Sequence, residues 1–172
     1  AALASGAERA SLRQRAAEVT ERELGEAVAA IGRYRDVLGD VADHAGARAA
    51  LDRLLRTPEF RSDAAQVLEP LYRNEGAWDR LVELRELGLE AEMDPHARRE
   101  ILGDIAQLHE RGRRDVGAAW QAWARALAEN AEDVSVQAEL ERLAASGGGG
   151  WQRLAELYEA RLEATMDPEL SR

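Results

Sequence analysis

The feature that most constrains this chain is a stretch of sequence that occurs twice at a fixed spacing. WDRLVELRELGLEAEMDP, at 78–95, returns 73 positions later as WQRLAELYEARLEATMDP, at 151–168. The tryptophan, the methionine and the closing Asp-Pro pair all keep that spacing. Self-similarity at a fixed period is the signature of a repeat protein, in which each unit buries its apolar face by stacking on neighbouring units.

A second internal match extends the repeat toward the N-terminus. Residues 16–54 overlay residues 105–143 at an offset of 89 without a gap, and their apolar positions coincide. The two offsets differ by 16 residues, about the length of the segment 57–73. We therefore expect the first unit to hold an extra helix at 57–73.

These matches define the expected domain organisation. Residues 1–172 are expected to form a single helical-repeat fragment of a longer array. The first unit covers about 5–77, the second about 78–150, and a third begins at 151–172.

Composition and periodicity predict an all-α chain of about nine helices. Alanine, leucine, glutamate and arginine dominate the 172 residues, and all four favour helices. Apolar side chains recur at helical spacing along most of the chain. Asp94-Pro95 is typical of a helix start, with a capping residue followed by proline in the first turn. In the first helix, the pattern predicts that Leu12, Ala16 and Val19 face inward.

Charge and absent residue types exclude several functions. The net charge of −10 argues against a broad nucleic-acid-binding or anionic-membrane surface. There is no cysteine, and all 23 basic residues are arginine, which excludes thiol nucleophiles, Schiff-base lysines and Walker-type phosphate loops. No apolar run approaches the ~20 residues of a membrane span. We expect no nucleic-acid partner and no membrane insertion; localisation stays open, with the cytoplasm favoured.

Two acidic rows could carry chemistry, but we interpret them as solvated helix faces. Paired carboxylates at helical spacing can bind a metal or transfer protons. However, both rows belong to the repeat, and local pairing with Arg80 or Arg153 is ordinary helix chemistry. The three histidines, at positions 44, 96 and 109, lie on separate segments without metal-binding spacing. We expect no catalytic residue, cofactor or metal site. The two rows are Glu83, Glu86 and Glu90, and Glu156, Glu159 and Glu163.

One arginine group is the candidate for partner binding. Arginine makes bidentate contacts with carboxylates and phosphates, so the group could recognise an acidic peptide or a phosphate. The alternative, which we favour, is that these side chains neutralise nearby glutamates and stabilise helix C-termini. The group consists of Arg98, Arg99, Arg111, Arg113 and Arg114.

The tryptophans have two interpretations as well. Trp120 and Trp123 could line an aromatic pocket for a peptide or a cation. Because they align with Ile31 and Tyr34 at the offset of 89, we favour core positions. The same interpretation is given to Trp78 and Trp151.

A family resemblance adds to these patterns. Ala119-x-x-x-Trp123-x-x-Ala126, preceded by Ile105-Ala106-x-x-His109, resembles the small–aromatic–small pattern of tetratricopeptide repeats. The segment Trp151-x-x-Leu154-x-x-x-Tyr158 is similar to the opening helix of such repeats and of half-TPR proteins. The sequence departs from the family where Ala106 replaces a glycine and Ala131 replaces a proline. The resemblance implies a right-handed α-solenoid of antiparallel helix pairs that binds protein segments or scaffolds assemblies.

The expected function is therefore protein–protein interaction or scaffolding without catalysis. The protein or peptide partner is not identified. Self-association through truncated repeat ends is expected, because such ends expose apolar faces meant for neighbouring repeats. The alternative is a regulatory or spacer segment of a larger multidomain enzyme or of a secretion or motility machine.

The core assignment of Trp123 is testable. Trp123→Ala should lower the free energy of unfolding by about 3–5 kcal/mol, because it removes a large buried ring and leaves a cavity. Thermal or chemical denaturation measures the loss. An unchanged melting curve would show that the ring is an exposed binding aromatic instead.

Overall fold

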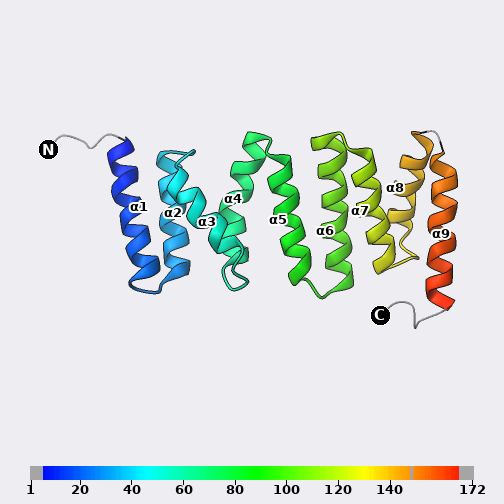
Figure 1. The fold of residues 1–172 in the computed structure, drawn as a ribbon, viewed down its shortest axis with the longest axis horizontal. Coiled ribbons are helices and arrows are strands. Elements are labelled where there is room, and N and C mark those ends of the chain that lie inside the picture. The colour runs from blue at the N-terminus through cyan, green and yellow to red at the C-terminus, as the bar shows by residue number, and fades with distance from the viewer. Residues whose placement is uncertain (1–5, 148, 167–172) are drawn as a thin grey trace. The chain divides into compact units, whose positions relative to one another are not determined.

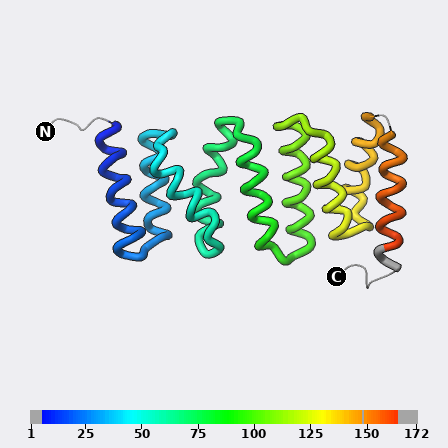
Figure 2. Tube along the Cα trace, in the orientation of Figure 1, coloured from blue at the N-terminus to red at the C-terminus, as the bar shows by residue number. Residues whose placement is uncertain are grey.

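The computed structural model describes residues 6–147 and 149–166. All secondary structure in these residues is helical, with nine α-helices and one π-helical segment (Figures 1 and 2). This confirms the predicted all-α class and the number of helices for the described residues. The chain divides into two compact units, and the boundary along the sequence falls between Ala77 and Trp78.

The first unit contains four helices, and the other three contact the central helix, α2. They are α1 (Gly6–Arg22), α2 (Ala27–Asp40), α3 (Ala45–Leu55) and α4 (Arg61–Glu75). Helices α1 and α2 lie side by side and run in opposite directions, and α2 also contacts α3 and α4 (Figure 1). The buried side chains of α2 are Ala27, Ala30, Ile31, Tyr34, Val37 and Leu38.

The second unit places α7 in the same central position. Its elements are α5 (Trp78–Ala91), α6 (Pro95–Gln107), η1 (Leu108–Arg113), α7 (Val116–Glu129), α8 (Val134–Ala145) and α9 (Gly150–Met166). Helix α7 contacts α6, η1 and α8, and α9 contacts α8. Its buried side chains are Ala119, Trp120, Ala122, Trp123, Ala126 and Leu127, so the core interpretation of both tryptophans is confirmed.

The offset of 89 seen in the sequence also relates helices and contacts. Helices α2 and α7 have bounds that differ by 89 at both ends, and α3 and α8 begin 89 residues apart. Two ion pairs between helices recur at the same offset. Arg9–Asp40 (3.1 Å) corresponds to Arg98–Glu129 (2.7 Å), and Glu21–Arg53 (2.5 Å) corresponds to Glu110–Arg142 (2.6 Å).

Side-chain caps fix the starts of several helices. The carboxylate of Asp94 accepts a hydrogen bond from the Ala97 amide at 3.1 Å, with Pro95 in the first turn, which confirms the helix start predicted there. Asp115 caps α7 in the same way, and Asp133 caps α8. His44 caps α3 through Nδ1, at the position that corresponds to Asp133. Each cap satisfies an amide that has no partner within the helix.

The predicted inner face of the first helix is wrong. Leu12 and Val19 are 66% and 52% exposed, and Ala16 is exposed between them. The buried face of α1 carries smaller and polar side chains instead. Small side chains on this face allow α1 and α2 to approach closely. The prediction failed because it placed the larger apolar residues of the helix on the inner face. The buried residues are Ala10, Gln14, Ala17 and Thr20.

Two further expectations are corrected. Trp151 is 58% exposed and is not a core residue. The extra helix expected at 57–73 is present as α4, but it begins later, at Arg61, because residues 56–60 form a turn; Pro70 lies inside it. The sequence pattern of the helix start at Asp94-Pro95 returns at Asp167-Pro168, and the further helix that it predicts there lies outside the described residues. No helix in the described part is long and apolar enough to cross a membrane.

The turn before α7 yields a stability prediction. Arg114 adopts a left-handed conformation with φ of 55°, whereas the residue 89 positions earlier is Gly25, with φ of 71°. A left-handed conformation costs a non-glycine residue about 1–2 kcal/mol. Arg114→Gly should therefore raise the free energy of unfolding by about 1 kcal/mol, measured by urea denaturation.

Two control variants isolate the backbone effect. Arg114→Ala removes the side chain without relieving φ, so it should leave stability within about 0.5 kcal/mol of wild type. Gly25→Ala should be destabilising by about 1 kcal/mol, because nothing lies within 4 Å of the added methyl group and only the backbone is strained. Equal stability of the glycine and alanine variants at Arg114 would contradict the explanation.

Candidate functional site

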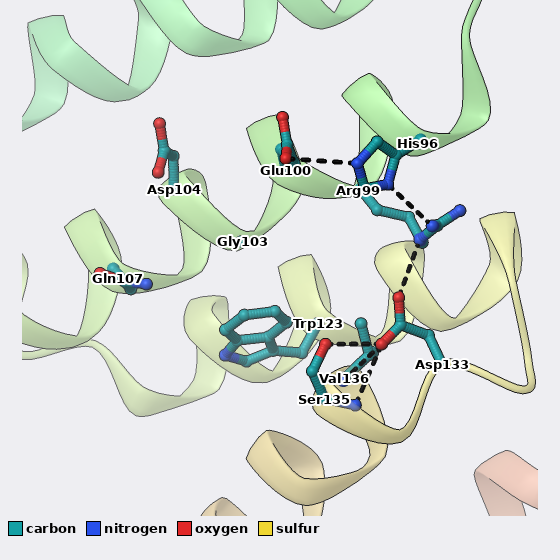
Figure 3. Close-up of a pocket in the computed structure, with 10 residues that line it drawn as sticks. All are labelled: His96, Arg99, Glu100, Gly103, Asp104, Gln107, Trp123, Asp133, Ser135 and Val136. Atoms are coloured by element: carbon teal, nitrogen blue, oxygen red, sulfur yellow. Dashed lines mark hydrogen bonds and ion pairs between the residues drawn. The ribbon is translucent and has the colours of Figure 1, made fainter.

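The second unit contains a groove between α6 and α8, with α7 behind it (Figure 3). Its volume is about 530 Å³. This is within the range of about 300–1,000 Å³ that is common for ligand sites. The lining residues are His96, Arg99, Glu100, Gly103, Asp104 and Gln107 from α6, Trp123 from α7, and Asp133, Ser135 and Val136 from the start of α8.

One face of α6 forms a wall of the groove. Positions 96, 99, 100, 103 and 107 are three or four residues apart, so they share one side of the helix. Gly103 lies in the middle of this face, opposite the ring of Trp123. A Cβ placed at Gly103 would lie only 3.1 Å from Cη2 of that ring. The glycine therefore leaves room for the indole at the base of the groove.

The first unit shows what a larger side chain does at this position. Gln14 stands 89 residues before Gly103 and is 8% exposed. Its Nε2 lies 3.0 Å from where a Cβ would be at Gly46, the position that corresponds to Ser135. Gln14 therefore occupies the space between α1 and α3 that is open between α6 and α8.

Trp123 differs from its counterpart Tyr34 in hydrogen bonding. The hydroxyl of Tyr34 donates to Oε2 of Glu21 at 2.8 Å, and burial together with this carboxylate raises the pKa of the tyrosine. The indole Nε1 of Trp123 is buried and has no hydrogen-bond partner among the described residues. A buried donor without a partner costs free energy, so Trp123 is a locally unfavourable element of an otherwise apolar core.

A chain of polar contacts runs along the mouth of the groove (Figure 3). Arg99 bonds Asp133 at 3.0 Å and contacts Nδ1 of His96 at 3.1 Å, and His96 in turn lies 3.4 Å from Glu100. Hydrogen bonds from the Ser135 hydroxyl, from two backbone amides and from Arg99 lower the pKa of Asp133 despite desolvation. These contacts hold the N-terminal turns of α6 and α8 together.

The charge of the groove is negative. Its lining contains the carboxylates of Glu100, Asp104 and Asp133, and the single guanidinium of Arg99. Asp104 also pairs at 3.2 Å with Arg85 on α5. Because carboxylates outnumber guanidinium groups in the lining, the groove favours a cationic ligand over an anionic one.

The five candidate arginines are not brought together. Arg98 and Arg99 are in the first turns of α6, whereas Arg111, Arg113 and Arg114 lie in or directly after η1. At a rise of about 1.5 Å per residue, the two groups are about 18 Å apart along the helix axis. Only Arg99 lines the groove. A partner-binding role for the five residues stays a prediction.

Several of these arginines have partners within the second unit. Arg98 pairs with Glu129 at 2.7 Å and donates to the carbonyl oxygens of Leu89 and Glu92, each at 3.0 Å. Arg113 pairs with Asp79 at 2.9 Å. Arg111 and Arg114 are exposed.

The acidic rows are engaged more widely than expected. Glu83 pairs locally with Arg80 at 2.7 Å, as predicted. Glu86 instead makes a two-pronged contact with Arg125 on α7, at 2.6 and 2.9 Å, and this contact lowers its pKa. Arg153 lies 4.8 Å above the ring of Trp120 rather than beside a glutamate. Among the described residues, no three histidine or acidic side chains are grouped to hold a metal ion.

The sequence interpretation did not identify the residues that line this groove. The sequence does contain one signal for this groove. Polar side chains follow Asp94-Pro95 along one side of the helix, and Gly103 interrupts them at the helical turn that faces Trp123. Comparisons of the chain with protein-family models, with curated proteins and with solved structures find no match. The candidate site therefore depends on the geometry alone.

His109 predicts a pH dependence of stability. It is buried in η1, and burial, followed by the nearby Arg113, lowers its pKa below the ordinary value of about 6.5. Between the two pKa values the unfolded state binds more protons than the folded state, so stability falls as the pH drops below about 6.5. His109→Gln should reduce the stability difference between pH 7 and pH 5.5, measured by urea denaturation.

The comparison uses this difference within each protein, so a general loss of stability in the variant cancels. A variant that loses as much stability as wild type between these two pH values would contradict the assignment to His109.

Proposed function

We propose that this chain is a non-catalytic protein–protein interaction module of tetratricopeptide-like repeats, and that it binds a protein segment in the groove between α6 and α8. Its helices would form a right-handed solenoid of antiparallel pairs. The observation that carries the proposal is the groove itself, in which the polar face of α6 stands beside an aromatic base. The groove residues that bear most directly on it are Arg99, Glu100, Gly103, Trp123 and Asp133.

The recurring contacts support the repeat architecture. The pairs Arg9–Asp40 and Arg98–Glu129 each join the first helix of a set to the second. The pair Glu21–Arg53 joins α1 to α3, and the pair Glu110–Arg142 joins η1, which follows α6, to α8. Equivalent ion pairs at one offset are expected when successive units keep the same helix packing, as in repeat proteins.

The chemistry of the groove favours a basic segment. Glu100 and Asp104 are exposed on α6 and can pair with a lysine or arginine of a ligand. Trp123 is only 8% exposed, and the small part of its ring that lines the base of the groove attracts cationic side chains. Exposed ion pairs contribute only about 0.2–1 kcal/mol each, so several must act together. We expect roughly micromolar affinity, which corresponds to about −8 kcal/mol.

Selection from a random peptide library tests this function. The 172-residue chain should enrich peptides with two or more basic residues, and calorimetry should give roughly micromolar affinity for the enriched peptides. Glu100→Lys should weaken their binding about tenfold, because it replaces an attraction with a repulsion at the groove wall. Glu59→Lys, an exposed change of the same charge in the first unit, should leave the affinity unchanged.

Two results would contradict the proposal. One is a library selection that enriches no peptide above background. The other is an equal loss of affinity in both charge variants, since this would reflect the total charge of the protein and not the groove.

A further inference from the structure

An apolar stripe on α1 has no cover among the described residues. Leu12 and Val19 are 66% and 52% exposed, and with Ala16 they are spaced four and three residues apart along one face of the helix. Exposed apolar side chains that form a continuous stripe mark an interaction surface more often than scattered ones do.

The second unit shows what covers the same positions there. At the offset of 89, the stripe corresponds to Ile101, Ile105 and Leu108 of α6 and η1. Ile105 is only 1% exposed, and Ile101 packs against the core. Helix α5 contacts both α6 and η1, and its Leu89 and Val82 belong to the same apolar cluster or pack against it. The stripe of α1 therefore has the position and apolar character of a seat for an α5-type helix.

The complementary surface is found on α9. At the offset of 73, α9 corresponds to α5, and Leu154 is buried as its counterpart Leu81 is. By contrast, side chains that are covered where α5 packs on α6 and η1 have exposed counterparts on α9. Leu162 is 64% exposed, whereas Leu89 is 4% exposed. Trp151 is also exposed, whereas the ring of Trp78 lies against Gly112, so closely that a Cβ there would be 2.6 Å from Cδ2.

We infer that α9 of one copy of this chain docks on α1 of a second copy, in the way that α5 packs on α6 and η1. This inference goes beyond the groove and does not depend on it. Each copy offers one α9 face and one α1 face, so the contact is head-to-tail. Contacts of this kind close into rings or extend into filaments.

A polar feature of α1 supports the same arrangement. In the second unit, Arg98 is held by Glu129 and donates to the carbonyl oxygens of Leu89 and Glu92 at the C-terminal end of α5. Arg9 is held by Asp40 in the equivalent ion pair. Its guanidinium is therefore placed where it would meet the C-terminal carbonyl groups of a docked α9. The last carbonyl groups of a helix have no partner within the helix, so they need donors of this kind.

One contact of the internal interface is not reproduced. Glu86 of α5 pairs with Arg125 of α7, but the corresponding residues are Glu159 on α9 and Asp36 on α2. Two carboxylates would face each other at this point of the docked interface. The contact between copies is accordingly weaker than the contact between α5 and its neighbours within the chain.

Sedimentation velocity of the 172-residue chain at increasing concentration tests the inference. The average mass should rise between roughly 10 μM and 1 mM, as expected for a weak contact. Val19→Glu and Leu162→Glu should each weaken association at least about tenfold, because each places a charge in an apolar contact. Val134→Glu, at an exposed valine of α8 outside both faces, should leave association unchanged.

A gain of affinity gives the sharper test. Asp36→Arg should strengthen association about fivefold, because it recreates the pair of Glu86 and Arg125 between two copies. Adding Glu159→Arg to that variant should remove the gain. Three results would overturn the inference: a strict monomer at 1 mM, association insensitive to Leu162→Glu, or no gain in the Asp36→Arg variant. The groove variant Glu100→Lys should associate like wild type, which separates this test from that of the groove.

Discussion

Both units depend on the burial of one helix by its neighbours. In the first unit α2 contacts α1, α3 and α4, and in the second α7 contacts α6, η1 and α8. Their buried faces alternate alanine with larger side chains, so a neighbouring helix approaches closely at Ala30 or Ala119 while Tyr34 or Trp123 fills the adjacent space. Close packing of this kind is sensitive to single methylene groups, and it explains why the apolar pattern of these two helices recurs without an insertion.

Small differences between the two sets of helices decide where a groove forms. The scaffold of ion pairs and helix bounds is shared, but Gln14 fills the position that Gly103 leaves open. A glycine inside a helix costs about 1 kcal/mol relative to alanine. The unpaired indole nitrogen of Trp123 adds a further cost, and the unpaired Oε1 of Gln14 carries a similar cost in the first unit. Functional sites are where such local costs are expected, because the packing elsewhere offsets them. The combination of Gly103 with Trp123 therefore favours a site over a defect.

The sequence predicted the helices better than their surfaces. The helical class and the cap at Asp94 followed from local patterns, since capping and periodicity involve residues a few positions apart. The burial of Trp120 and Trp123 followed instead from the repeat, which aligns them with Ile31 and Tyr34. The inner face of α1 was wrong because its apolar residues lie on two sides, and periodicity does not tell which side meets α2. The groove was beyond prediction because it requires residues such as Arg99 and Asp133, 34 positions apart, to meet in space.

Binding at the two proposed surfaces is driven by different interactions. The groove presents carboxylates to water, and attraction between exposed charges weakens as salt screens it. The faces of α1 and α9 carry Leu12, Val19, Trp151 and Leu162, whose burial releases water and depends little on salt. Copies of a chain with a net charge of −10 also repel one another, and salt reduces that repulsion. Raising the ionic strength therefore acts against the groove and in favour of contact between copies, so one chain can carry both surfaces without their competing for the same conditions.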